Sequence, residues 1–215
     1  MNYGGGHSEK FFSTAKRRLL IIKIIDYKAG NAPSVMHAVR KVGFDADFAR
    51  EPKDLEGATG IILPGVGSAG ATMKSLRESG MSGELIHYVI GKAVPFLGVC
   101  VGMQVLFDYS EEDGVYCFGF LEGEVRKFDK PNLRVPQMGW NRVIFTEREN
   151  SGYYYFVNSY YVDSDINKNY AWGLARYGDF FTAAVRYNNI YGTQFHIEKS
   201  GEAGLKLLKG FLSLC

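Results

Sequence analysis

The fold of this chain follows from an aliphatic stretch near its start, Leu20-Ile21-Ile22-Lys23-Ile24-Ile25. The stretch is enriched in β-branched residues, and only Lys23 interrupts it. A run of this kind is typical of a strand that is buried on both faces. Such strands occur in parallel sheets that helices cover on both sides. The stretch therefore predicts the first strand of a parallel α/β sheet.

The residues that follow alternate between helical and strand-like patterns. Pro33 stands where the first turn of a helix tolerates it, apolar residues then recur at helical spacing, and Gly43 ends the helix. Further strands are predicted at 45–49, 60–63 (stopped by Pro64) and 94–99, and further helices at 69–78 and 84–90. This β-α-β alternation predicts a flavodoxin-like, doubly wound α/β fold, with a mostly parallel sheet flanked by helices.

The second half of the chain has a different pattern. Between Tyr116 and Phe195, short runs rich in Tyr, Phe and Val are separated by Gly, Asn and Asp, which predicts several additional antiparallel strands. The apolar spacing at 201–212 predicts a helix that closes the fold. We expect one domain over residues 19–215, preceded by a flexible N-terminal extension over residues 1–18.

Composition excludes several classes of function. The chain has 215 residues and a formal net charge of +2, so no basic field exists to drive nucleic-acid binding. No apolar run reaches the ~18 residues that a membrane span needs. The three cysteines are too few for a disulfide framework, and no paired spacing suggests a metal site. We therefore expect a cytoplasmic protein without nucleic-acid or membrane partners, a metal or a cofactor.

The sharpest local motif is Gly98-Val99-Cys100-Val101-Gly102-Met103-Gln104, directly after the predicted strand at 94–99. A nucleophile at such a strand-to-helix junction sits on a strained turn, and glycines two residues away allow close backbone approach. The N–H groups of the following helix favour a thiolate. Cys100 is thus a candidate nucleophile, and the alternative is a small buried cysteine in a glycine-packed core.

A thiolate nucleophile needs a base, and His196 is the best placed of the four histidines. It ends the strand predicted at 190–195, at the sheet edge where α/β ligand sites gather. Glu198 follows two residues later and, in an extended stretch, points to the same side, so it can orient the imidazole. Cys100, His196 and Glu198 form a plausible catalytic triad. Without Cys100, a surface His-x-Glu pair would be the simpler interpretation.

Acyl transfer also needs donors for an oxyanion. Pro64-Gly65-Val66-Gly67 follows the predicted strand at 60–63 and reaches the same sheet edge. The glycines let the peptides beside Val66 and Gly67 rotate and present an N–H, and the N–H of Val101 can be a second donor. Taken alone, the segment also fits an ordinary turn between a strand and a helix.

The motifs at 98–104, 64–67 and 195–198 together resemble the class I glutamine amidotransferases, which hydrolyse glutamine through a cysteine thioester and pass ammonia to a synthase. Segments 26–31, 63–67, 136–141 and 196–200 narrow the resemblance to the glutaminase subunit of imidazole glycerol phosphate synthase. The resemblance runs from about residue 20 to the C-terminus.

This resemblance implies a set of roles. Cys100, His196 and Glu198 would be catalytic, and the partner would be the barrel-shaped cyclase subunit, forming a heterodimer that makes imidazole glycerol phosphate and aminoimidazole carboxamide ribotide for histidine synthesis. The remaining implied site residues fall into two groups: glutamine-binding Gly65, Gln104, Ser159 and Tyr160, and partner-facing Asn31, Trp140 and Lys199.

Two residues depart from the family pattern. Ile197 stands where the family usually has Pro, and Asn158 stands where it usually has His. Neither replaces a triad member, so the glutaminase expectation is unchanged. The departures leave open a divergent paralogue that feeds ammonia to a different synthase. A stand-alone cysteine peptidase or glutamyl hydrolase of the same fold is a further alternative, and an inactive assembly subunit is a third.

Overall fold

Five parallel strands form the centre of the structure, which the computed structural model describes over residues 20–28, 31–163 and 169–215. The extension predicted over residues 1–18 lies outside the described residues. Every residue of the strands Gly60–Gly65 and Phe96–Cys100 is buried, as their aliphatic composition predicts. In spatial order the strands are β2 (Ala46–Ala49), β1 (Ile22–Ile25), β3 (Gly60–Gly65), β4 (Phe96–Cys100) and β13 (Ile190–Thr193).

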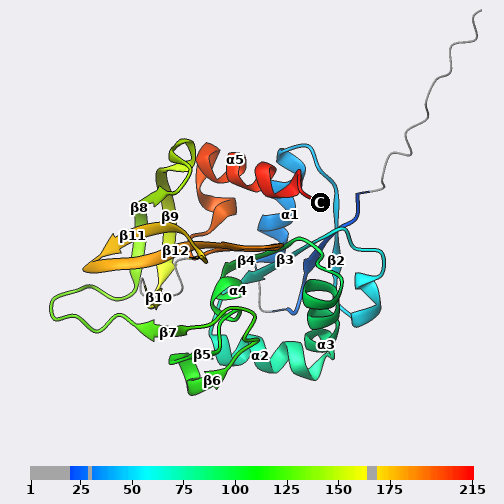
Figure 1. Ribbon diagram of the computed structural model, residues 1–215, viewed down its shortest axis with the longest axis horizontal. Helices are drawn as coiled ribbons and strands as arrows, with labels where there is room; N and C mark the ends of the chain where they lie inside the picture. The colour runs from blue at the N-terminus through cyan, green and yellow to red at the C-terminus, as the bar shows by residue number, and fades with distance from the viewer. Residues whose placement is uncertain (1–19, 29–30, 164–168) are drawn as a thin grey trace, which may run out of the picture.

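The second half of the chain extends this sheet, mainly with antiparallel strands, as predicted (Figure 1). Beyond β13 lie β12 (Asp179–Tyr187), β10 (Tyr160–Asp163), β7 (Glu124–Lys127), β5 (Tyr109–Ser110) and β6 (Val115–Tyr116). A branch from β12 consists of β11 (Ala171–Tyr177), β8 (Gln137–Phe145) and β9 (Gly152–Asn158).

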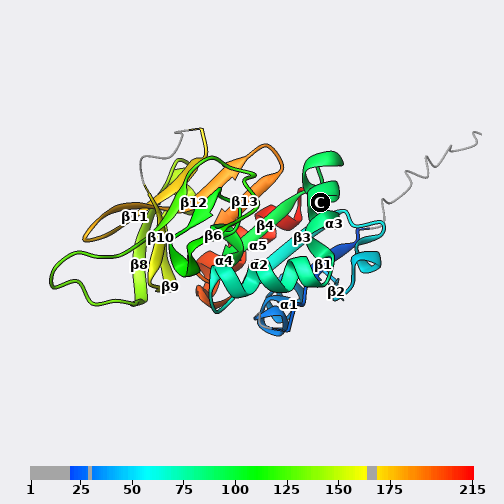
Figure 2. The same cartoon turned by 90° about the horizontal axis from the view of Figure 1, so that it is seen from below.

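Helices cover both faces of the parallel strands. Figures 1 and 2 show α1 (Ala32–Lys41) and α5 (Gly201–Leu212) on one face and α2 (Ala69–Glu78) and α3 (Met81–Ile86) on the other. In α1, Val35 and Val39 are four residues apart and fully buried, so one side of the helix faces the sheet. The doubly wound α/β fold is confirmed.

Pro64 does not stop its strand, contrary to the sequence prediction. The N–H of Gly60 bonds Ile21 on the β1 side, whereas the N–H of Ile61 bonds Pro95 on the β4 side. By this alternation the nitrogen of Pro64 faces the β1 side, where the pairing with β1 has already ended at Ile62. No ladder hydrogen bond is lost there, so β3 continues to Gly65.

Two other boundaries differ from the prediction. The helix predicted at 84–90 begins earlier, as α3, and continues as a π-helical turn over His87–Gly91. The strand predicted at 190–195 ends at Thr193, and a 3₁₀ turn at Ile197–Lys199 follows before α5. The 3₁₀ turn matters because it contains Glu198 and directly follows His196, the two candidate catalytic residues of this segment.

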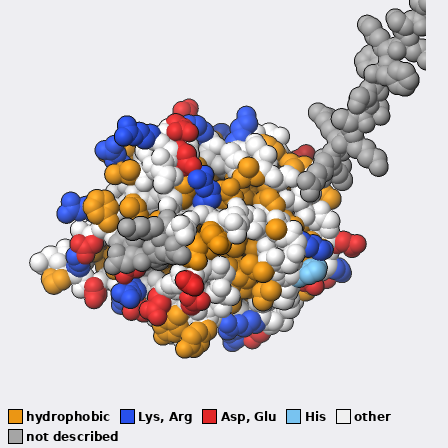
Figure 3. Space-filling view, viewed as in Figure 1, with side chains coloured by type: hydrophobic (Ala, Val, Ile, Leu, Met, Phe, Trp, Pro, Cys, Tyr) orange, Lys and Arg blue, Asp and Glu red, His pale blue; other side chains and the backbone are white. Residues whose placement is uncertain are grey.

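Charged side chains of both signs are interspersed on the face shown in Figure 3. Exposed apolar side chains include Met138, Trp140 and Ile144 of β8 and Tyr153 of β9. Among the described residues, no helix has the length and apolar character that a membrane crossing requires.

Candidate active site

Cys100 is the last residue of β4 and precedes α4 (Val101–Gln104), a single helical turn. Its backbone has φ 56° and ψ −111°, a conformation that non-glycine residues rarely adopt, and its side chain is buried. A Cβ on Gly98 would lie 2.3 Å from the carbonyl oxygen of Gly102, and one on Gly102 would lie 2.0 Å from that of Leu63. The strained turn with glycines for close backbone approach is therefore present, as predicted.

His196 and Glu198 are in direct contact. Nδ1 of His196 lies 2.9 Å from Oε1 of Glu198, and both side chains are buried. The route to this contact differs from the prediction, because the segment is a 3₁₀ turn and not an extended stretch. Asn31, at the start of α1, donates from Nδ2 to the same carboxylate oxygen at 2.5 Å. Two side chains thus contact one oxygen of this carboxylate.

The charge state of His196 is set by its neighbours. Burial acts to lower the pKa of His196, but hydrogen bonds and charges from Cys100 and Glu198 outweigh it and raise the pKa to about 10. An imidazolium at neutral pH is the partner that a thiolate requires. In contrast, burial raises the pKa of Cys117 to about 11 and that of Cys215 to about 12. Those two thiols therefore remain protonated near neutral pH.

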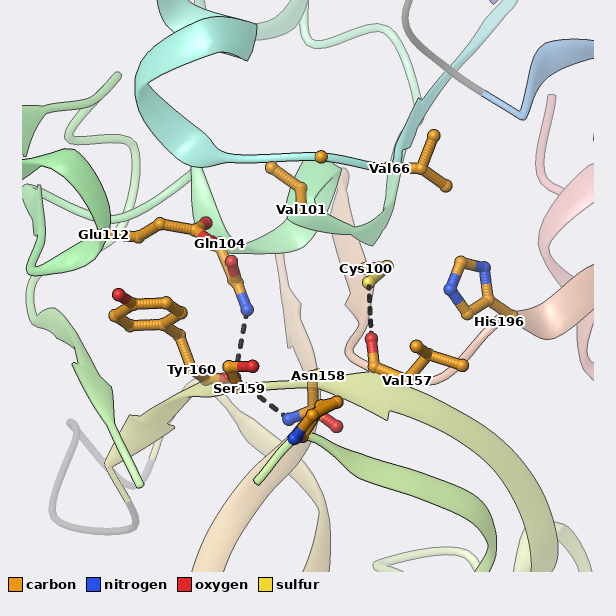
Figure 4. A pocket seen from close by; sticks show the side chains of 12 residues that line it. Val66, Cys100, Val101, Gln104, Glu112, Val157, Asn158, Ser159, Tyr160 and His196 are labelled. Atoms are coloured by element: carbon orange, nitrogen blue, oxygen red, sulfur yellow. Dashed lines mark hydrogen bonds between the residues drawn. The ribbon is translucent and has the colours of Figure 1, made fainter. Parts of the chain in front are cut away.

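A cavity of about 250 Å³ opens beside Cys100 and His196. Figure 4 shows these two side chains at one end of the cavity and those of Glu112, Gln104 and Tyr160 at the other. Segments far apart in the sequence meet here, at the carboxyl edge of the parallel strands. The lining residues are Val66, Gly67, Cys100, Val101, Gln104, Glu112, Pro136, Val157, Asn158, Ser159, Tyr160 and His196.

Most residues predicted for oxyanion or glutamine binding line this cavity, but Gly65 does not. A Cβ on Gly65 would lie 2.5 Å from the backbone nitrogen of Gly102 and 2.7 Å from Cβ of Val101. Gly65 therefore allows β3 to pack against α4, and its direct contact with glutamine is not supported by the geometry. Gly67 has φ +103°, a conformation that suits glycine, and open space around its Cα.

Glu112 was not predicted from the sequence. It lies in the run Glu111-Glu112-Asp113, which has the composition of a solvated surface turn. In the structure Oε2 of Glu112 accepts a hydrogen bond from the N–H of Ala69 at 2.9 Å, and the side chain lines the cavity. Burial raises the pKa of this carboxyl group, although the bond from Ala69 acts in the opposite direction. Only the fold brings it to the site.

The three residues predicted to face a partner lie in different environments. Trp140 is 55% exposed and Lys199 is exposed, whereas Asn31 is half-buried against Glu198. Their roles at an interface stay predictions. Among the described residues, no group of three His, Cys, Asp or Glu is placed to hold a metal ion.

Comparison with known proteins now gives the family. The model of the class-I glutamine amidotransferases matches residues 23–214, nearly the whole described chain. The chain belongs to this family. The family resemblance stated from the sequence is therefore confirmed.

Curated relatives of this amidotransferase are subunits of one synthase. Imidazole glycerol phosphate synthase subunit HisH from Herpetosiphon aurantiacus is 42% identical over 201 residues, covering 90% of this chain and 94% of the relative. Subunit HisH 1 from Campylobacter jejuni is 42% identical over 204 residues, covering 90% and 100%. Subunit HisH from a Geobacillus species is 40% identical over 206 residues, covering 90% and 97%.

Solved structures agree with the fold of this amidotransferase. A glutamine amidotransferase crystal structure superposes with a TM-score of 0.74 at 22% identity, covering 90% of this chain and 97% of that one. PurLQS from Thermotoga maritima superposes with a TM-score of 0.71 at 18% identity, covering 90% and 98%.

Proposed function

We propose that this chain hydrolyses glutamine to glutamate and ammonia, with Cys100 as the nucleophile, His196 as the general acid and base, and Glu198 as the residue that orients His196. The observation that carries the proposal is the shared cavity, in which Cys100 on its strained turn meets a histidine held by Glu198. The family match supports the substrate and the reaction type.

The first half of the reaction forms a thioester. The thiolate of Cys100 attacks the side-chain carbonyl carbon of glutamine, and the C–N bond breaks as His196 donates its proton to the departing ammonia. The raised pKa of His196 keeps that proton available at neutral pH. In the second half, His196 takes a proton from water, the resulting hydroxide attacks the thioester carbon, and glutamate leaves as the Cys100 thiolate is regenerated.

Backbone N–H groups of the two glycine-flanked turns would stabilise the oxyanion formed at each step. Val66 and Gly67 follow β3, and Val101 follows the nucleophile, so both turns lie at the cavity. Each correctly placed donor is worth on the order of 3 kcal/mol of transition-state stabilisation.

The end of the cavity away from Cys100 suits the amino-acid end of glutamine. The Glu112 carboxylate is the complement of an α-ammonium group, and Gln104, Ser159 and Tyr160 offer polar groups beside it (Figure 4). With the ammonium at Glu112, the side chain of glutamine extends toward Cys100. The cavity thus accounts for both ends of the substrate.

We further propose that the ammonia passes to the cyclase subunit of imidazole glycerol phosphate synthase, in histidine biosynthesis, within a cytoplasmic heterodimer. The relatives that are about 40% identical over 90% of this chain carry the name of that synthase. Asn31, Trp140 and Lys199 would face the cyclase. The free state of all three cysteines is consistent with a reducing compartment.

The two departures from the family pattern are compatible with this chemistry. Ile197 is 1% exposed and does not line the cavity that contains Cys100 and His196. Asn158 donates from Nδ2 to the carbonyl oxygen of Tyr160 at 2.9 Å. Neither residue is placed to replace a member of the triad.

Labelling with a glutamine-analogue electrophile tests the proposal. Peptide mass spectrometry should find Cys100 modified much faster than Cys117 or Cys215, because the latter two thiols stay protonated. Protection by glutamine should slow the modification of Cys100. Equal labelling of the three cysteines would contradict the amidotransferase mechanism.

A further inference from the structure

A buried carboxamide lies beside the sulfur of the nucleophile. Gln194 lies between the end of β13 and Phe195, is fully buried, and has its Nε2 3.7 Å from Sγ of Cys100. Its main-chain N–H donates to the carbonyl oxygen of Ala183 in β12 at 2.8 Å, which fixes the backbone at this point. A buried amide needs partners for its polar atoms, so this placement has a defined hydrogen-bond geometry.

The orientation of the Gln194 amide follows from the carbonyl oxygen of Tyr160, which acts through the side chain of Gln104. The carbonyl oxygen of Tyr160 can only accept, so the group of Gln104 that lies 3.1 Å from it must be Nε2. The same Nε2 lies 3.0 Å from Gln194, which must therefore present its oxygen to Gln104. The amide nitrogen of Gln194 is left facing the sulfur of Cys100.

The amide of Gln194 matters for the charge of the sulfur because the other neighbouring groups, apart from His196, do little to stabilise a thiolate. The carbonyl oxygen of Val157 lies 3.9 Å from Sγ and suits a thiol that donates, but it opposes a negative sulfur. The helical turn after Cys100 has only four residues, so its dipole is small. Besides His196, the donor that the described residues place at the sulfur is Gln194.

We infer that Gln194 is a positioning residue that stabilises the thiolate of Cys100 by donating a side-chain hydrogen bond to it. The inference rests on the proposed function, in which Cys100 is the nucleophile. Gln104 holds the amide of Gln194 in its donating orientation, so the glutamine-binding end of the cavity and the nucleophile share one hydrogen-bond network.

The test is the pH dependence of Cys100 alkylation by iodoacetamide, which needs no glutamine turnover. The variant Gln194→Met keeps the length of the side chain and removes the donor. A hydrogen bond to a charged group is strong enough that its loss should raise the midpoint of the alkylation profile by about one pH unit. At pH values below the wild-type midpoint, alkylation should then be about tenfold slower, and kcat for glutamate release should fall at those pH values.

The other titratable groups around the sulfur and along its cavity are common to all variants. They are His196, Glu198 behind it, Tyr27 and Glu112. The shift between wild type and Gln194→Met therefore reports the removed donor. Thr193→Val is the matched control: Thr193 is also fully buried, and its Oγ1 donates to the carbonyl oxygen of Phe195 instead of the sulfur. We expect this control to lose some stability and to keep the wild-type midpoint.

Gln194→Glu provides a second arm if the first variant folds poorly. It keeps an oxygen acceptor for Gln104 and replaces the donor with an oxygen, so KM should change little while the midpoint rises at least as far as in Gln194→Met. An unchanged midpoint in a folded variant would overturn the inference and leave the proposed function standing. A wild-type chain that releases no glutamate even when paired with the cyclase would instead overturn the proposed function.

Discussion

Nδ1 of His196 lies 2.9 Å from Oε1 of Glu198, and a single residue separates the two in the chain. The 3₁₀ turn at Ile197–Lys199 brings the carboxylate back toward the ring, and Nδ2 of Asn31 donates to the same carboxylate oxygen. With Nδ1 engaged, the other ring nitrogen is the one free for exchange of protons at the cavity. The pair thus fixes both the orientation and the proton position of the histidine.

Cys100→Ser should abolish glutamine hydrolysis and leave the fold intact. The two side chains are similar in size, but a hydroxyl is far less ionised than a thiol near neutral pH. Glutamate release is the measurement, and Cys117→Ser is the control because Cys117 lies outside the cavity. Residual turnover within about tenfold of wild type, roughly 1.4 kcal/mol of barrier, is incompatible with a covalent role for Cys100.

Ammonia supplied directly should bypass that defect. The complex of Cys100→Ser with the cyclase should still make imidazole glycerol phosphate at high ammonium concentration and raised pH, because this chain contributes only nitrogen delivery. Product formation with ammonium and with glutamine as alternative nitrogen sources is the measurement. If both activities are lost together, Cys100 has a further role in assembly or in the chemistry of the partner.

The stability of the folded chain should fall as pH rises from about 6.5 to about 10. The pKa of His196 is raised from 6.5 to about 10, so its protonated form stabilises the folded state fully below the lower value and loses that effect through the upper one. At roughly 1.4 kcal/mol per unit the loss amounts to a few kcal/mol. Urea unfolding across this range measures it.

His196→Asn should remove this part of the pH dependence, whereas the control His87→Asn should keep it. His87 is exposed, in the π-helical turn after α3. The same pair of variants separates the roles in catalysis, since only His196→Asn should lose glutaminase activity. Equal effects of the two substitutions would show that the wrong histidine has been assigned.

Glu112→Gln should raise KM for glutamine by tenfold or more and have a smaller effect on kcat. The reason is that a hydrogen bond to a charged group contributes about 1.5–3 kcal/mol to binding. The amide keeps an oxygen acceptor for the N–H of Ala69, so the local structure should survive. Glu111→Gln is the matched control, because Glu111 accepts from the N–H of Lys127 and does not line the cavity. A raised KM in the control alone would place the ammonium elsewhere.

The sequence was sufficient to predict the parallel half of the sheet and the strained turn at Cys100. Three aliphatic strands, β1, β3 and β4, are recognisable because burial on both faces leaves few polar residues in them, and the spacing of Gly98 and Gly102 around Cys100 reflects close backbone approach. The contact of Glu198 with His196 was predicted correctly but from an extended geometry, since local sequence did not distinguish a strand end from a 3₁₀ turn.

Glu112 and Gln194 were missed for a different reason. The contact of Glu112 with Ala69 joins residues 43 positions apart, and that of Gln194 with Cys100 joins residues 94 apart. No local pattern marks such contacts: Glu112 sits in an acidic turn, and Gln194 directly follows the strand that ends at Thr193. Their roles depend on the packing of β4 against β13 and of α2 against the turn at Glu112–Gly114.

The last prediction concerns control of the glutaminase by its partner. Val66 and Gly67 line the cavity beside Cys100, so a peptide N–H of this turn is a candidate oxyanion donor. If that N–H points away from Cys100 in the chain without its partner, the oxyanion lacks one donor. Docking of the cyclase would then rotate the peptide and supply the donor.

We therefore expect the isolated chain to be a very slow glutaminase, accelerated at least ~10²-fold by the cyclase with its ligand bound, the effect of gaining one oxyanion donor. Gly67→Val should blunt this acceleration more than it weakens glutamine binding, because Gly67 has φ +103° and a β-branched residue there would restrict rotation of the neighbouring peptide. Gly43→Val is the matched control, since Gly43 also has a positive φ and open space beside it and does not line the cavity. Steady-state glutamate release with and without the partner decides the matter: a lone wild-type chain that already turns over as fast as the liganded complex has no such switch.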